Sequence, residues 1–279
     1  MTLEQLRIFI AVAEREHLTR AAEALPLSPS AVSAAIAALE GRYGVKLFDR
    51  IGRRLALTEA GRLFLIEARR VLAQAREAET VLHEVAGAQR GLLSLSTSQT
   101  VGNYWIASRL ARFRKDFPGV EVRLHIGNTE QAAALVLSGE ADMGLVEGRV
   151  DDPRLSVTAL SGDRVVMVTP PGRNETPQRF VAREKGSGTR AILDEVLRSR
   201  GLGEEAIALT LPSNEAVRAA VEAGSGAAVL SWLVVEGAVA AGRLVAREID
   251  VPVRPFHLIR LKERSEGRAA AAFKTICAG

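Results

Sequence analysis

The chain has 279 residues, of which 47% are hydrophobic and 25% charged, and its formal net charge is +4 at pH 7. This length favours two domains, and the composition is typical of a globular protein. The single cysteine, Cys277, excludes an internal disulfide and any cysteine-rich metal site. No stretch approaches the roughly 18 apolar residues of a membrane span, and no export signal precedes the first helical pattern. We therefore expect a cytoplasmic protein that holds no metal or cofactor.

The first 45 residues predict three helices. The apolar face of the first helix is formed by Leu3, Leu6, Phe9, Ile10 and Ala13. A short helix over 19–25 and a tight turn follow. Ser28 and Pro29 then open the third helix, because serine caps a free backbone N–H and proline suits the first helical position. Val32, Ile36 and Leu39 recur at helical spacing and are expected to pack inward.

The outer stripe of this third helix consists of small residues, Ser30, Ser33, Ala34 and Ala37. A helix with a small, polar outer face after a tight turn suits insertion into a DNA major groove. Spacing alone is equally compatible with an ordinary helical hairpin whose outer face is solvated. The residues that follow favour DNA, because 51–58 read as a small hairpin carrying Arg53 and Arg54.

At this point the chain resembles the winged helix-turn-helix of LysR-type transcriptional regulators. The matching residues are Ala21-Ala22, Ser28, Ala31-Val32-Ser33, Leu39-Glu40, Gly44-Val45-Lys46-Leu47-Phe48, Arg50 and Leu57-Thr58-Glu59-Ala60-Gly61. The resemblance implies a DNA-binding domain over residues 1–58. It identifies as candidate DNA contacts Ser28, Ser30, Ser33, Ala34, Arg50, Arg53 and Arg54. Double-stranded DNA is the partner that it implies.

Two positions depart from the family pattern. The family commonly has Gln-Pro where this chain has Pro29-Ser30, and often Arg or Lys near Ala34. Because long polar side chains are missing from the outer face, we expect apolar contacts to thymine and DNA shape to carry more of the specificity.

A long helix is predicted from Thr58 to about Val85. Its apolar residues follow a 4-3 spacing typical of a coiled-coil seam, namely Phe64, Ala68, Val71, Ala75, Ala78, Leu82 and Val85. We expect dimerisation through Phe64, Val71, Leu82 and Val85; the alternative is an amphipathic helix lying on its own domain. The family's linker helix pairs subunits, and the resemblance implies a tetramer built as a dimer of dimers. The linker and hinge are assigned to 59–90, since glycines at 87 and 91 break the pattern.

Residues 91–279 alternate strands and helices. Strands are expected at 92–96, 120–126, 141–146, 165–168, 180–182, 206–211, 227–230, 244–249 and 256–261. Helices are expected at 103–116, 130–137, 189–200, 214–223 and 233–240, with a last one ending near Cys277. This order predicts two α/β lobes with mostly parallel sheets and helices on both faces. Ligands of such sheets bind beyond the carboxyl ends of strands, against helix N-termini.

Three loops in that position are rich in hydrogen-bonding groups: 97–100, 127–129 and 183–190. A helix start with hydroxyls and no obstructing side chains is a good anion site. The candidate effector contacts are Ser98, Gln99, Thr100, Asn128, Thr129, Glu147, Gly188 and Thr189, although plain helix capping remains an alternative for the hydroxyls. Arg190 is either a bridging cation or, more simply, a surface residue.

The same region resembles the effector-binding domain of LysR-type regulators, which is itself similar to periplasmic solute-binding proteins. The run from Gly186 to Arg190 and the triplet Gly102-Asn103-Tyr104 look like the subgroup of carbon-fixation and sulfur-assimilation regulators. That likeness favours a small anionic effector.

Two other classes compete with a regulator. An enzyme is disfavoured because His17, His83, His125 and His257 are scattered, and no nucleophile turn or dinucleotide fingerprint occurs. A solute-binding transport protein explains 91–279 but not the first ninety residues. A ligand-responsive transcription regulator explains both halves.

Overall fold

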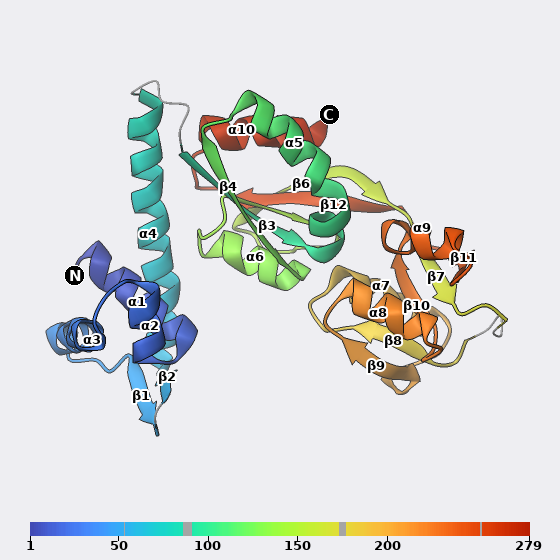
Figure 1. Cartoon of the computed structure of the whole chain (residues 1–279), viewed down its shortest axis with the longest axis horizontal. Helices are drawn as coiled ribbons and strands as arrows, with labels where there is room; N and C mark the ends of the chain where they lie inside the picture. Colours follow the sequence, from blue (N-terminus) through green and yellow to red (C-terminus); the bar gives the residue numbers. More distant parts are fainter. Residues whose placement is uncertain (53, 86–90, 173–176, 252) are drawn as a thin grey trace. The chain divides into compact units, whose positions relative to one another are not determined.

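A computed structural model describes the chain except residues 53, 86–90, 173–176 and 252 (Figure 1). The side chains of residues 77, 80 and 83–85 also lie outside the described part. The chain divides into two compact units: the first contains residues 1–82 and 138–140, and the second contains 83–137 and 141–279. The proposed boundary at 58 lies at the start of a helix, whereas the hinge at 86–90 lies outside the described residues.

The first unit is a winged helix-turn-helix followed by a long helix. Its elements are α1 (Leu3–Arg15), α2 (Leu18–Ala24), α3 (Pro29–Tyr43), β1 (Phe48–Ile51), β2 (Arg54–Leu57) and α4 (Glu59–Val85). Ser28 caps α3 as predicted, since its hydroxyl accepts from the backbone N–H of Ala31. Thr58 caps α4 in the same way through Gly61 N–H, and its own hydroxyl donates to Lys46 O. β1 and β2 pair antiparallel as the wing.

One hydrophobic core joins α1, α2, α3 and the beginning of α4. Val32, Ile36 and Leu39 are buried as predicted. The prediction that Leu3 belongs to the packed apolar face of α1 was wrong, because Leu3 is exposed. Ile8 and Val12 are buried in addition, since α2 and α3 together cover a wider arc of α1 than one helix would.

Glu40 ties α3 to the wing. Its carboxylate accepts from the backbone N–H groups of Leu47 (2.9 Å) and Phe48 (3.3 Å) and pairs with Lys46 at 2.6 Å. Burial alone would raise the pKa of Glu40, but the hydrogen bonds from Lys46, Leu47 and Phe48 outweigh it and lower the pKa. The charged carboxylate therefore holds the chain where it turns from helix into strand.

The second unit consists of two lobes. The first lobe contains β3 (Gly91–Ser98), a π-helical turn (Val101–Trp105), α5 (Ile106–Asp116), β4 (Val120–Gly127), α6 (Thr129–Leu137), β5 (Met143–Val146), β6 (Leu155–Asp163), β12 (Arg254–Leu261) and α10 (Arg268–Ala278). The second lobe contains β7 (Val165–Thr169), β8 (Phe180–Arg183), α7 (Gly188–Ser199), a 3-10 turn (Glu204–Ala206), β9 (Ile207–Leu211), α8 (Asn214–Glu222), β10 (Ala228–Ser231), α9 (Trp232–Ala240) and β11 (Val245–Glu248).

The sheet of the first lobe has the strand order β4-β3-β5-β12-β6. Its apolar residues pack against α5 and α10 in one core and against α6 in another, so helices cover both faces (Figure 1). In the second lobe β10-β7-β11 form one sheet and β8-β9 another. Alternate residues of β7 face two different cores.

The prediction of mostly parallel sheets was wrong. β3 pairs parallel with β4 and β5, and β8 with β9, but β12 pairs antiparallel with β5 and β6, and β7 with β10 and β11. β12 runs antiparallel to β6 because β6 leads into the second lobe and β12 returns from it. β6 itself was not predicted, since its residues between the two buried ends are mostly exposed and do not alternate cleanly.

Among the described residues, no group of His, Cys, Asp and Glu is arranged to hold a metal ion. No single described helix is long and apolar enough to cross a membrane; α2 and α3, which meet at 108°, pass that test only as a bent pair.

Candidate functional site

The two lobes of the second unit are joined by polar contacts at the ends of their strands. Gln99, just after β3, accepts from the backbone N–H of Asn214 (3.0 Å) and donates to Pro212 O (2.8 Å). Asn214 Nδ2 donates to Thr100 Oγ1 at 3.1 Å, and Thr100 donates onward to Glu147 Oε1 at 3.3 Å. A second contact joins Tyr104 to Glu215 at 2.9 Å. The first lobe is therefore fastened to the start of α8.

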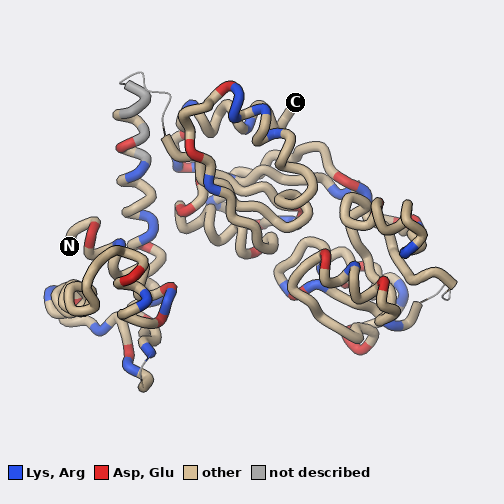
Figure 2. The backbone as a smooth tube through the Cα atoms, in the orientation of Figure 1, with Lys and Arg blue, Asp and Glu red and all other residues tan. Residues whose placement is uncertain are grey.

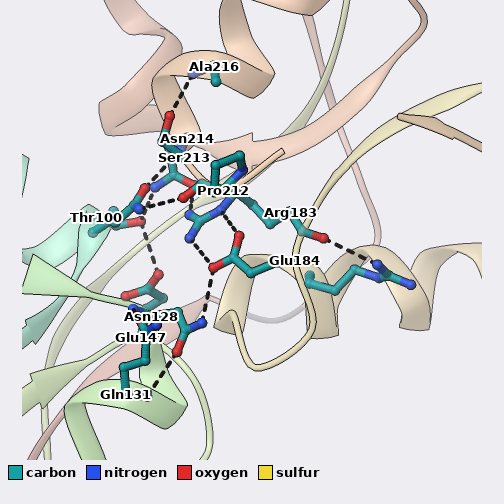
Figure 3. Close-up of polar contacts among 12 residues, drawn as sticks. Thr100, Asn128, Gln131, Glu147, Arg183, Glu184, Pro212, Ser213, Asn214 and Ala216 are labelled. Carbon is teal, nitrogen blue, oxygen red and sulfur yellow. Dashed lines mark hydrogen bonds and ion pairs between the residues drawn. The ribbon is translucent and has the colours of Figure 1, made fainter. Parts of the chain in front are cut away.

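Arg183 extends this network through the second lobe (Figure 3). It is only 2% exposed, and it donates to Asn214 Oδ1 at 2.6 Å and to both oxygens of Glu184 at 2.8 Å. Glu184 also accepts from Asn128 Nδ2 at 3.1 Å, which returns the network to the first lobe. Burial would raise the pKa of Glu184, but hydrogen bonds from Arg183 and Asn128 lower it. The network thus closes a ring across the two lobes.

Beside this ring, four buried polar side chains carry an oxygen atom without a hydrogen-bond partner. These atoms are Thr129 Oγ1, Glu147 Oε2, Ser187 Oγ and Thr189 Oγ1. They surround Gly148 and Gly188, where the two lobes come into backbone contact: a Cβ atom on Gly188 would lie 2.7 Å from Gly148 Cα. Buried hydroxyls and carboxyls normally have partners. Their grouping at one point indicates a place for a polar ligand.

A cavity of about 1040 Å³ adjoins this cluster. Its lining includes Thr129, Glu147, Ser187, Arg254 and His257. Arg254 and His257 each bring a further buried nitrogen without a partner, Nη1 and Nδ1 respectively. Donors and a carboxyl group from both lobes therefore border the same space.

The cluster lies at the N-terminus of α7. Ser187 precedes this helix of 12 residues, and its hydroxyl makes no capping hydrogen bond. A helix N-terminus offers free backbone N–H groups and a partial positive charge, which favours an anion.

The arginines around the cluster are paired with carboxylates. Arg254, at the start of β12, forms a buried two-point pair with Asp163, at the end of β6, with distances of 2.9 and 2.7 Å. This pair joins the end of β6 to the start of β12, the two places where the chain passes between the lobes. Arg190 pairs with Asp194 (2.7 Å) and Glu204 (3.1 Å) and is buried. The expectation of a surface arginine at position 190 was therefore wrong, because the guanidinium bridges the start of α7 to the chain before β9.

The carboxyl group of Glu147 is buried, and the charges of Arg254, Asp163 and Arg183 act on it. Desolvation raises its pKa, and this exceeds the opposing effect of Arg254, while Asp163 raises the pKa further. Its backbone N–H donates to Ser98 Oγ at 3.2 Å. Burial thus shifts the protonation equilibrium of Glu147 toward its neutral form.

The predicted effector residues separate into two groups. Ser98, Gln99, Thr100 and Asn128 are engaged in hydrogen bonds within the protein, whereas Thr129, Glu147 and Thr189 retain a free oxygen beside Gly188. Sequence reasoning missed Arg183, Glu184, Ser187, Asn214 and Arg254. The first three stood in the loop already singled out, but nothing in the sequence places Arg254 beside that loop.

The candidate DNA contacts lie on α3 and the wing. Ser30 and Ala34 are exposed, Ser33 is half-buried, and Ser28 Oγ contacts Ser30 Oγ at 3.0 Å. Arg50 and Arg54 are exposed on the two strands of the wing. Figure 2 shows in blue where lysine and arginine residues lie along the chain, the wing included. Arg53 lies outside the described residues, so its assignment stays a prediction.

The candidate pairing residues of α4 differ in exposure. Leu82 is 70% exposed and Val71 is 41% exposed, whereas Phe64 packs against Phe9 with ring centroids 4.9 Å apart. The side chain of Val85 lies outside the described part. Phe64 thus has an apolar partner within its own domain, which agrees with the alternative interpretation of this end of the helix. Leu63 and Ile66, which the heptad pattern passed over, are exposed.

Comparison with known proteins identifies the family. Residues 3–62 match the model described as bacterial regulatory helix-turn-helix protein, lysR family, and residues 86–279 match the LysR substrate binding domain. The chain belongs to the LysR family of transcriptional regulators. It is a DNA-binding transcription regulator with an effector domain, and members of this family are regulators rather than enzymes.

Full-length relatives support this LysR assignment. The chain is 35% identical to the uncharacterised HTH-type transcriptional regulator YeiE of Escherichia coli K12, covering 99% of this chain and 97% of that protein. It is 32% identical to the RuBisCO operon transcriptional regulator of Allochromatium vinosum, covering 98% and 94%. Among solved structures, the LysR family regulator CbnR matches with a TM-score of 0.71 at 22% identity, covering 99% and 98%. This last likeness shows the LysR fold.

Proposed function

We propose that the effector of this LysR regulator is a small anion that binds between the lobes at the N-terminus of α7. The observation that carries the proposal is the group of buried oxygens without partners on Thr129, Glu147, Ser187 and Thr189. An unpaired buried polar atom costs about 1–3 kcal/mol, and a ligand that pairs several of them recovers this cost.

The electrostatics support an anion rather than a cation. The helix N-terminus supplies partial positive charge, and Arg254 Nη1 adds a buried donor whose guanidinium is otherwise bound by Asp163. Such an anion joins Thr129 of the first lobe to Ser187 and Thr189 of the second. Occupancy therefore changes the relative stability of lobe arrangements, which is how an effector acts on a distant DNA-binding unit.

Calorimetric titration of the full-length chain with sulfate tests this site. Thr129→Val keeps the side-chain shape but removes the hydroxyl, so we expect the dissociation constant to rise about tenfold or more. Thr158→Val, on the exposed part of β6, is the matched control and should leave it unchanged. Absence of sulfate binding to the parent, or equal affinities of the parent and Thr129→Val, would contradict the proposal.

We further propose that α3 and the wing contact duplex DNA through Ser28, Ser30, Ser33, Ala34, Arg50, Arg53 and Arg54. Exposure of the small outer face of α3 supports this assignment. A site on DNA with two half-sites requires at least a dimer. The exposed apolar residues Val71 and Leu82 of α4 are the candidate residues of the dimer interface. A dimer of dimers is the full assembly that we expect.

A further inference from the structure

The two oxygens of the Glu147 carboxyl group have different environments. Oε1 accepts a hydrogen bond from Thr100, which in turn accepts one from Asn214. Oε2 is buried without a partner, and the residue is only 4% exposed. One side of this carboxyl group is thus fixed by the contacts between the lobes, while the other side borders the proposed anion site.

The cations nearest to Glu147 are already compensated. Arg254, on β12, is paired with Asp163 on β6, and Arg183, on β8, is paired with Glu184. An ionised Glu147 would therefore add a net negative charge to a buried region.

The other basic groups that line the adjoining cavity are Lys185, Arg190, His257 and Arg149. Lys185 is exposed and pairs with Glu204, and Arg190 pairs with Asp194 and Glu204. His257, on β12, has a pKa lowered mainly by burial, with a contribution from Arg149, against a hydrogen bond with the Gly148 backbone that raises it. Arg149 is exposed, so water screens its charge. None of these groups supplies an uncompensated buried positive charge to balance an ionised Glu147.

An anion beside an ionised Glu147 would be opposed by like-charge repulsion at low dielectric. A neutral carboxyl group removes that repulsion, and its O–H becomes a donor in place of an acceptor. This donor would complete the set of Thr129, Ser187 and Thr189.

We propose that Glu147 is the specificity-determining residue of this site and that it binds the anion as a neutral acid, donating from Oε2. The inference rests on the proposed function of the site. It has two consequences: binding is linked to proton uptake by Glu147, and the preferred ligand presents an oxygen that carries no proton at the contact. The raised pKa of Glu147 is in the direction that this requires.

The sign of the linkage follows from the anion itself. A bound anion raises the pKa of Glu147 above its value in the free protein. The affinity for the anion is therefore highest at pH values where Glu147 is already protonated in the free protein. It falls as the pH rises above the pKa that Glu147 has in the free protein, by at most about tenfold per pH unit for one proton. Sulfate is the suitable probe, because its oxygens carry no proton in the neutral range.

The test is a series of calorimetric sulfate titrations of the full chain between about pH 5.5 and 8.5. We expect the parent to lose affinity with rising pH. Glu147→Gln retains a donor of similar shape but cannot ionise, so it should bind sulfate with an affinity that changes little across the series. His257→Asn should keep the dependence of the parent, which separates Glu147 from the histidine.

Each outcome decides between the claims. If sulfate binds the parent with the same affinity at every pH, or if Glu147→Gln keeps the pH dependence of the parent, the neutral-acid role is wrong while the anion site stands. If His257→Asn abolishes the dependence, the proton resides on the histidine and the inference is wrong. If sulfate does not bind at any pH, both the inference and the proposed function fall.

Discussion

Thr100 and Glu147 are 47 residues apart in sequence, yet Thr100 Oγ1 donates to Glu147 Oε1 at 3.3 Å. The same hydroxyl accepts from Asn214 of the second lobe. Thr100 is completely buried, so its hydroxyl acts as a relay between the lobes. The sequence predicts Thr100 as a direct effector contact; from its hydrogen bonds we expect it to act instead through the position that it gives to Glu147.

Thr100→Val removes this relay without changing the side-chain shape. Glu147 and Asn214 would each lose a buried partner, so we expect the effector domain to lose about 1–3 kcal/mol of stability. Sulfate affinity should also fall, while DNA binding without ligand changes little. Urea unfolding and calorimetry measure the two effects. Unchanged values in both would mean that the hydroxyl serves only as a local cap.

Glu40→Gln should destabilise the DNA-binding unit by about 1.5–3 kcal/mol at neutral pH, because a charged acceptor of two backbone N–H groups is replaced. The folded-state pKa of Glu40 lies below its ordinary value of 4.5. Ionised Glu40 therefore contributes its full share to the free energy of unfolding above the ordinary pKa of 4.5. This share is lost as the pH falls through the lower pKa that Glu40 has in the folded protein. Unfolding of the parent should show this extra acid sensitivity relative to Glu40→Gln. Glu79→Gln, exposed on α4, is the control and should behave like the parent.

If the wing enters a narrow minor groove, Arg54→Ala should weaken DNA binding by about 1–3 kcal/mol. If Arg54 contacts a phosphate instead, the variant should release about one ion fewer on binding, which lowers the slope of affinity against salt concentration. Fluorescence anisotropy at several salt concentrations separates these cases. Arg123→Ala, an exposed change on β4, serves for comparison. Parental affinity and salt dependence for Arg54→Ala would remove Arg54 from the interface.

Val71→Glu combined with Leu82→Glu should dissociate the dimer, because two-fold related helices would then bring carboxylates into an apolar interface. Val71→Ile with Leu82→Met keeps the surface apolar and should preserve the assembly. Sedimentation velocity measures both. If the double glutamate variant sediments like the parent, subunits pair through another surface.

The sequence predicted the positions of the helices and of most strands, because apolar periodicity is local, but not the antiparallel pairing of β7 and β12. It missed β6, whose partner β12 is about 100 residues away and most of whose residues are exposed. It likewise misplaced Arg190, because a buried guanidinium is recognisable only once Asp194 and Glu204 are seen beside it.

Prediction of the candidate site had the same limit, because local composition can be seen in the sequence and distant contacts cannot. Loops with hydroxyl residues were found from composition, including Thr129 and Thr189. Which hydroxyls are free could not be predicted, since this depends on partners such as Asn214 from the other lobe. The charge balance around Glu147 depends on Arg254, which reaches the site only through the return of β12.

The most direct test of the account is the thermal unfolding of Thr129→Val with and without sulfate. A hydroxyl that is buried and unpaired costs stability until a ligand pairs it. The variant should therefore be more stable than the parent in the absence of sulfate, and it should gain less when sulfate is added. If Thr129→Val is less stable than the parent without ligand and gains equally from sulfate, the hydroxyl has a structural role and the effector site lies elsewhere.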